Sequence, residues 1–145
     1  RSACMQDSWR LGKITSINHT CSRSKAERLF FDSLRTNLGD DVRNDIVLHH
    51  RDHWLFPDVI STDTRVVIEF YGDYWHANPN IYKATDIVHH GLLASDIWWV
   101  DEERASVIEQ LDYRVLIVWQ SDFKNNPELT IYNLLSIIDW DTCGL

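Results

Sequence analysis

Two short apolar runs, residues 56–60 and 66–76, constrain the fold of this chain more than any other feature. A polar stretch separates them, and apolar runs joined in this way are typical of a β-hairpin. If the connection is a two-residue turn at positions 62–63, Asp58 lies opposite Val67 on the second strand. The segment therefore predicts a hairpin with a carboxylate inside each strand.

The predicted hairpin brings two acidic side chains to one face of a sheet. Side chains alternate between faces along a strand, so Asp58, Glu69 and Tyr71 share a face. Carboxylates on a half-buried surface repel unless a proton or a cation lies between them. A divalent metal with oxygen ligands would satisfy both. The alternative is that Asp58 caps a turn and Glu69 is a solvated side chain of an ordinary alternating strand.

Length and composition indicate one folded domain. The chain has 145 residues and 17.1 kDa, with 44% hydrophobic residues and seven Trp, enough for a core of its own. Its apolar runs are too short to cross a membrane. Three cysteines without CxxC spacing indicate neither a disulfide framework nor a zinc ribbon, so we expect an intracellular setting. The chain begins at Arg1, and we expect it to be a fragment of a longer protein.

The net charge of −8 argues against a domain that holds nucleic acid by charge alone. An acidic metal site accounts for part of this charge, and bound cations would cancel some of it. Any affinity for DNA would then reside partly in another segment.

The remaining pattern predicts an α/β fold with the order α-β-β-β-α-β-α, a mixed β-sheet flanked by helices. Residues 1–21 are aperiodic and are expected to form an arm or linker before a single domain, 22–145. Ser24 and Glu27 fit a capping box, which explains Glu27 without any catalytic role. A long irregular stretch at 77–93 suggests a functional loop. The other expected elements are helices at 24–39, 94–111 and 128–138 and strands at 44–50 and 114–119.

Asp101 is unusual within its expected helix. Ile97 and Ala105 lie four residues before and after it, which places this carboxylate on the apolar stripe. A carboxylate there needs a partner, and His76 at the end of the second hairpin strand is a candidate. Such a pair would orient the imidazole as a proton acceptor. The alternatives are that Asp101 caps a later helix start or pairs with Arg104.

Several motifs occur together in one order along the chain. They are Ser24-Lys25-Ala26-Glu27, Phe56-Pro57-Asp58, Gly72-Asp73-Tyr74-Trp75-His76, Asp101-x-x-Arg104 and the run from Tyr113 to Trp119. Over residues 24–122 they resemble the very-short-patch-repair (Vsr-like) endonucleases. They are still more similar to the EDxHD homing endonucleases of phage introns, a branch of the PD-(D/E)xK nuclease superfamily. This resemblance implies a restriction-endonuclease-like core.

The resemblance also implies a role for individual residues. Asp58 matches the metal-binding aspartate, and the backbone carbonyl of Phe70 would be a further ligand. His76 matches the histidine that helps to deprotonate the attacking water, and Asp101 matches the aspartate that binds this histidine. Glu27 matches a glutamate that reaches the metal site from the first helix, often through water. The implied cofactor is Mg²⁺ or Mn²⁺, and the implied products carry a 5′-phosphate and a 3′-hydroxyl.

The chain departs from the family pattern at several positions. Tyr71 stands where the repair enzymes carry a second histidine and where most of the superfamily carries lysine. Glu69 occupies the second acidic position of the superfamily and could be a metal ligand. Asp73 and Asn80 stand near the positions of zinc-binding cysteines, so no structural zinc is expected. The aromatic side chains Tyr71, Tyr74 and Trp75 are candidate DNA contacts, and for the last two the alternative is core packing.

The expected function is therefore metal-dependent hydrolysis of phosphodiester bonds in double-stranded DNA, by the catalytic domain of a homing-type endonuclease. The expected context is phage or bacterial, without a membrane, with a possible dimer or an additional DNA-binding domain upstream. Mismatch nicking and an inactive DNA-binding module are alternatives. A further alternative is a domain that binds another metal or small ligand through His49-His50-x-x-His53 and His89-His90.

Overall fold

The fold is built on a mixed four-stranded sheet. The computed structural model describes residues 23–143, with side chains as far as residue 138, and the expected arm at 1–21 lies outside them. The sheet has the strand order β1-β4-β5-β6, in which only β5 and β6 are parallel. Its strands are β1 (Val42–Arg43), β4 (Val59–Ser61), β5 (Val66–Tyr71) and β6 (Arg114–Trp119). A separate antiparallel hairpin consists of β2 (Leu48–His50) and β3 (His53–Leu55).

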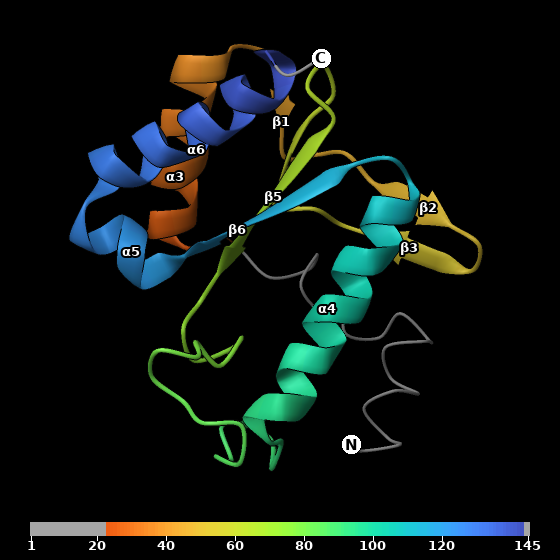
Figure 1. The fold of residues 1–145 in the computed structure, drawn as a ribbon, viewed down its shortest axis with the longest axis vertical. Coiled ribbons are helices and arrows are strands. Elements are labelled where there is room, and N and C mark those ends of the chain that lie inside the picture. The colour runs from red at the N-terminus through yellow and green to blue at the C-terminus, as the bar shows by residue number, and fades with distance from the viewer. Residues whose placement is uncertain (1–22, 144–145) are drawn as a thin grey trace.

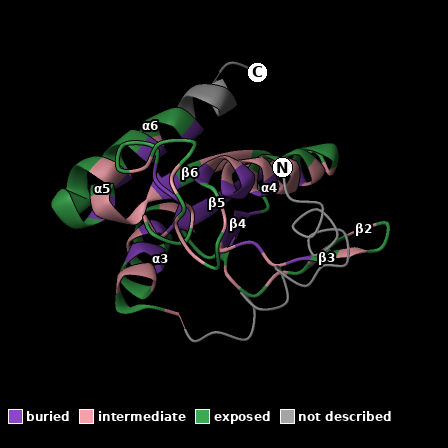
Figure 2. Cartoon of the chain, turned by 90° about the horizontal axis from the view of Figure 1, so that it is seen from below, coloured by how far each residue is buried: buried purple, intermediate pink, exposed green. Residues whose placement is uncertain are grey.

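Four helices of the described chain pack on this sheet and confirm the expected α/β class (Figure 1). They are α3 (Lys25–Leu38), α4 (Ala94–Gln110), α5 (Gln120–Asn125) and α6 (Pro127–Cys143). Alternate residues of β5 face opposite ways. Ile68 and Phe70 pack with α3, α5 and α6, whereas Val67 packs with α4 and the β2–β3 hairpin. All residues of β4 and β5 are consequently buried between the two layers (Figure 2).

The connection between β4 and β5 is longer than the two-residue turn that we expected. Ser61 pairs with Val66 and Val59 pairs with Ile68, so four residues form the turn. The last of them, Arg65, has a φ of 58°. The expectation that Asp58 lies opposite Val67 is therefore wrong. Continued by one residue beyond the pair of Val59 and Ile68, the observed register places Asp58 opposite Glu69. A shift of two residues keeps each side chain on the same face, so the two carboxylates come closer together than expected.

Two other expected elements differ from the structure. Only β2, at the end of the range, falls within the single strand expected at 44–50, and β1 lies just before that range. An additional strand, β3, lies between β2 and the first run of the expected hairpin, which forms β4. A short helix, α5, precedes the last helix, which starts at Pro127 rather than Glu128. Pro lacks an N–H and is favoured in the first turn of a helix, so it separates α5 from α6.

The irregular stretch expected at 77–93 contains neither helix nor strand, apart from one isolated bridge between Ile87 and Leu93. Within the described part of the chain, no helix combines the length and apolar character that crossing a membrane requires.

Candidate active site

Asp58 and Glu69 lie side by side at the end of the sheet where β4 begins and β5 ends. The Asp58 N–H donates to Glu69 Oε2 at 3.3 Å, and the Phe70 N–H donates to Asp58 Oδ2 at 2.8 Å. Each carboxylate thus accepts a backbone N–H of the facing strand, and the charge of Glu69 acts on Asp58, as expected for two acidic side chains on one face. Phe70 adjoins Asp58 through its amide, and the role of its carbonyl as a ligand stays a prediction.

Arg104 on α4 neutralises Glu69. Its Nε and Nη2 atoms donate to Glu69 Oε1 at 3.1 and 2.9 Å, and Nη2 also donates to the Phe56 carbonyl at 3.0 Å. The exposed fractions of the two side chains are 12% for Arg104 and 3% for Glu69. Burial alone would raise the pKa of Glu69, but the charge of Arg104 and the hydrogen bonds to Glu69 bring it below its usual value. Glu69 is therefore the anionic partner of an arginine, and we leave it out of the proposed metal ligands.

Among the residues that the structure describes, no cation binds the Asp58 carboxylate in this way. Burial raises its pKa well above the usual value, and the nearby charges of Glu69 and Glu27 raise it further. Glu27 lies on the first turn of α3, where its N–H donates to Ser24 Oγ at 3.1 Å, so capping and proximity to Asp58 coexist. Arg23 lies beside this group, 3.9 Å from Glu27, but its hydrogen bond in the site goes to the Asp58 carbonyl. No cation of the described residues thus pairs with the Asp58 carboxylate, and its surroundings disfavour the charged form.

His76 and Asp101 form the pair that the apolar stripe of α4 predicted. His76 Nδ1 lies 2.9 Å from Asp101 Oδ2. A carboxylate only accepts hydrogen bonds, so Nδ1 carries a proton, and in the neutral form of the ring Nε2 has the lone pair. Both alternatives for Asp101 are wrong, because Arg104 binds Glu69 and α4 begins seven residues earlier, at Ala94.

Tyr71 joins the two parts of the site. Its ring stacks on the His76 ring with centroids 3.8 Å apart and an interplanar angle of 5°. Burial raises the pKa of the Tyr71 phenol above its usual value, and the charges of Asp101 and Glu69 add to this effect, so the group stays neutral. The residue is only 6% exposed, which leaves little of its ring for DNA. It supports His76, and its role as a DNA contact stays a prediction.

Tyr74 and Trp75 are exposed rather than packed in the core. Their exposed fractions are 46% and 58%, and their rings meet edge to face at 5.2 Å. His89 from the following loop lies against both rings, and its Nε2 is 2.8 Å from the Trp75 carbonyl. The alternative of core packing is wrong, and the two aromatic rings stay candidate DNA contacts.

The loop after β5 is held in place through Asp73. Its Oδ1 accepts hydrogen bonds from Asn78 Nδ2 at 2.6 Å and from Ser121 Oγ at 2.8 Å. The side-chain oxygen of Asn78 in turn accepts from the Asn80 N–H at 3.0 Å. The two positions where the resemblance suggested lost zinc ligands are thus part of one hydrogen-bonded network.

The residues around Asp58 fit a divalent cation. The charges of Glu69 and Glu27 both act on Asp58 there. Arg104 pairs with Glu69 and Arg23 lies 3.9 Å from Glu27, so Asp58 is the carboxylate that no described cation pairs with. Among the described residues, no group of three or more His, Cys, Asp or Glu side chains has the arrangement of a complete metal site. Mg²⁺ does not need one, because it keeps several waters and commonly binds one or two carboxylates together with substrate phosphates. Asp58 and Glu27 are the side chains that would hold it.

Sequence reasoning missed the roles of Arg104 and Tyr71. Arg104 lies three residues after Asp101 and hence on a neighbouring part of the same helix face. A glutamate in a fully buried strand requires a cation, which was a usable signal for this pair. The stack of Tyr71 on His76 depends on the turn after β5, and the spacing of the two residues in the sequence does not predict this contact.

No protein-family model matches this chain, and no curated protein sequence is significantly similar to it.

Proposed function

We propose that this chain is the catalytic domain of a metal-dependent, homing-type endonuclease. The enzyme would hydrolyse phosphodiester bonds in double-stranded DNA. The observation that carries the proposal is the meeting of two different groups at one end of the sheet. One is the uncompensated Asp58 carboxylate with Glu27 beside it, and the other is the His76–Asp101 pair. Tyr71 feels the charges of Asp58 and Asp101 and stacks on His76, so the two groups border the same small region.

Each side chain has a defined task in the proposed reaction. Asp58 and Glu27 would bind Mg²⁺ or Mn²⁺, and the bound ion would supply positive charge for a scissile phosphate and increase the acidity of a nearby water. His76 Nε2 accepts the proton of the attacking water, while Asp101 keeps the proton on Nδ1 and fixes the ring orientation. The stacked Tyr71 ring restricts His76 from one side. Water then attacks phosphorus in line as the opposite P–O bond breaks.

A plasmid cleavage assay tests this function. We expect the protein to convert supercoiled DNA in Mg²⁺, to be inactive in EDTA, and to lose cleavage in the Asp58→Ala variant while remaining folded. Near-parental cleavage by that variant would refute the assignment of Asp58.

The acidic composition leads to a second expectation for the same domain. We expect weak DNA binding that depends on divalent metal and decreases with salt, because the net charge is −8. Tight and sequence-selective binding of DNA by this domain in EDTA would contradict the expectation that specificity resides in another segment of the protein.

A further inference from the structure

The β2–β3 hairpin carries exposed side chains that the proposed site does not use. One face of the hairpin is anchored, because Leu48 and Leu55 pack with Ile108 of α4. His49 and Trp54 pair across the strands and alternate with these leucines, so they lie on the opposite, outer face. The hairpin projects beside α4 on the right of Figure 1.

The outer face of the hairpin presents an aromatic surface. The rings of His49 and Trp54 stack with centroids 4.2 Å apart and an interplanar angle of 24°, yet Trp54 is 56% exposed. A rigid, half-exposed indole supported from one side can stack on a base or a sugar of a nucleic acid.

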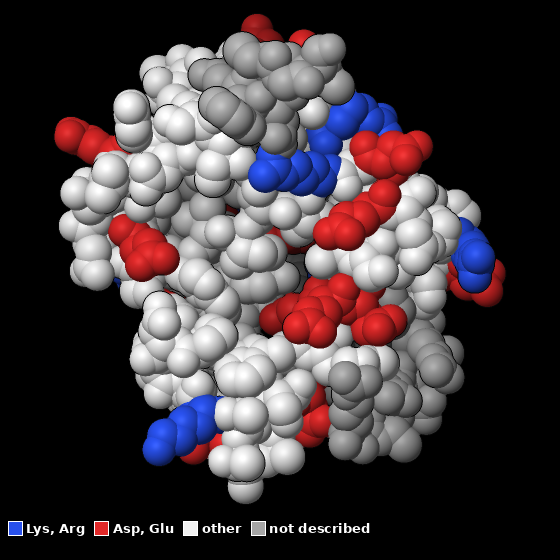
Figure 3. Space-filling model, in the orientation of Figure 1, with Lys and Arg blue, Asp and Glu red and all other residues white. Residues whose placement is uncertain are grey.

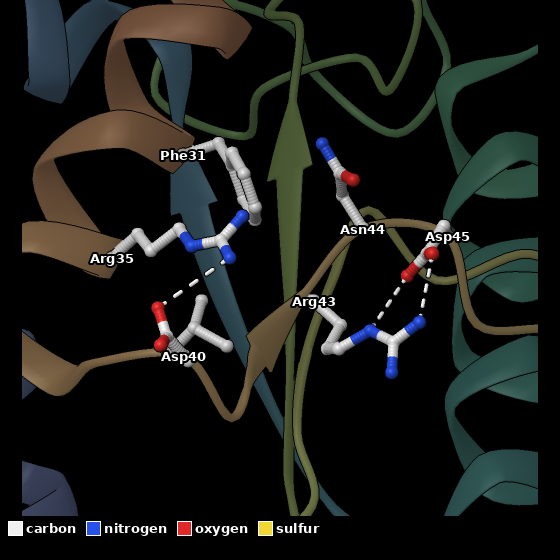
Figure 4. A pocket seen from close by; sticks show the side chains of 7 residues that line it. Phe31, Arg35, Asp40, Arg43, Asn44 and Asp45 are labelled. Carbon is white, nitrogen blue, oxygen red and sulfur yellow. Dashed lines mark hydrogen bonds and ion pairs between the residues drawn. The ribbon is translucent and has the colours of Figure 1, made fainter.

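The tip of the hairpin supplies a free positive charge. Arg51 is exposed, has a φ of 55°, and pairs with no side chain among the described residues. Two arginines near β1 are, in contrast, paired within the protein. Arg35 and Arg43, which line a cavity of about 310 Å³, bind Asp40 and Asp45 (Figure 4).

This charge stands out on an acidic molecule. The face drawn in Figure 3 has acidic side chains around its hollowed middle and few basic ones. A positive charge such as that of Arg51 would attract a phosphate that the acidic side chains of this protein repel.

The hairpin is rigidly connected to the candidate site. Its second strand continues through Phe56 directly to Asp58, and Arg104 binds the Phe56 carbonyl at 3.0 Å. Asp58 follows Arg51 by seven positions, so the Cα atoms of the two residues lie at most about 25 Å apart. That distance corresponds to about seven steps of a DNA strand.

We propose that the β2–β3 hairpin is a second contact with duplex DNA, in which Arg51 binds a backbone phosphate and Trp54, supported by His49, stacks against the nucleic acid. This inference rests on the proposed nuclease function, because the DNA is the substrate of the Asp58 site. It adds an interaction surface formed by residues other than Tyr74 and Trp75, on the hairpin that packs against α4.

The test compares binding and cleavage in hairpin variants of the whole chain. The probes are a mixed-sequence duplex in Ca²⁺ for affinity, and a supercoiled plasmid in Mg²⁺ for single-turnover cleavage. We expect Trp54→Ala to weaken duplex binding about tenfold. We expect Arg51→Gln to weaken it several-fold and to reduce the slope of log affinity against log salt by about 0.9. The maximal cleavage rate at saturating protein should change less than about twofold, because neither residue touches the reacting atoms.

Two matched variants control for general effects of charge and of exposed aromatic area. Lys124→Ala removes one exposed positive charge on α5, and Tyr132→Ala removes a ring that is 67% exposed on α6. Both should bind duplex as the parent does. Equal losses in the controls, unchanged affinity in both hairpin variants, or no duplex binding by the parent would overturn the proposal. Normal binding by a parent that cannot cleave, with the hairpin losses intact, would refute the nuclease function and leave the hairpin contact standing.

Discussion

The buried pair of Arg104 and Glu69 offers the most direct energetic test of the site. Substituting Arg104→Met keeps much of the side-chain volume but leaves a carboxylate that is 3% exposed without its cation. Removing one member of a buried ion pair costs about 3–5 kcal/mol. Glu69 keeps a hydrogen bond from the Asp58 N–H and can take up a proton, so we expect a loss near the lower limit, about 3 kcal/mol. In a domain of this size the melting temperature should decrease by about 10 °C.

A double-mutant cycle separates the pair from other effects. In urea unfolding, Arg104→Met, Glu69→Gln and the double variant should show a coupling energy of at least about 2 kcal/mol, because removing both charges leaves neither one stranded. The ion pair of Arg43 and Asp45 is a matched control, at 2.8 Å but with side chains 49% and 62% exposed. Its cycle should yield less than about 1 kcal/mol. A coupling for the buried pair no larger than this control would refute the reasoning.

The same pair predicts a dependence on pH. The paired Glu69 has a lowered pKa, so it contributes stability above the unfolded pKa of a glutamate, and this stability is lost as the pH falls through the lowered native value. In Arg104→Met the unpaired, buried Glu69 should instead have a raised pKa, which destabilises the native state at neutral pH. The deficit of this variant should therefore shrink between about pH 8 and about pH 5. A constant deficit would contradict this account.

Three further outcomes concern the catalytic residues. Asp58→Asn should raise the melting temperature in EDTA at neutral pH, because burial and two nearby carboxylates disfavour the Asp58 anion. The same variant should not cleave plasmid DNA in Mg²⁺. A lower melting temperature would contradict this account. His76→Ala should reduce the single-turnover rate more than Asp101→Asn, and the double variant should be little slower than His76→Ala; additive losses would refute the coupled pair. Tyr71→Phe should retain the rate because it keeps the stacked ring, whereas Tyr71→Leu should lower kcat with little change in KM; equal rates would exclude a positioning role.

The parts of the fold that sequence predicted well have strong periodic patterns. The run at 114–119 coincides with β6, and the helix expected at 94–111 coincides with α4 within one residue. The predicted pair of His76 and Asp101 followed from a carboxylate on an apolar stripe, which leaves few ways to satisfy it.

The failures have physical causes that are local to a few residues. The turn between β4 and β5 contains several polar residues, and nothing in their order distinguishes a two-residue turn from a four-residue turn in which Arg65 takes a positive φ. The β2 and β3 strands are only three residues long, too short for a period of two to stand out. The pair of Arg104 and Glu69 joins residues 35 positions apart, and such contacts depend on how α4 packs on the sheet.

The hydrogen bonds around Asp73 have a consequence for how this protein responds to chelators. Asp73, Asn78 and Ser121 tie the turn that carries Trp75 and His76 to the start of α5 through direct contacts of protein atoms. Removing divalent ions would leave these contacts in place, so His76, the proposed general base, and its neighbours would keep their arrangement. Adding or removing the metal would then start or stop cleavage without rearranging the protein. Complexes with uncleaved DNA could therefore be prepared in a chelator with the side chains of the site in their usual arrangement.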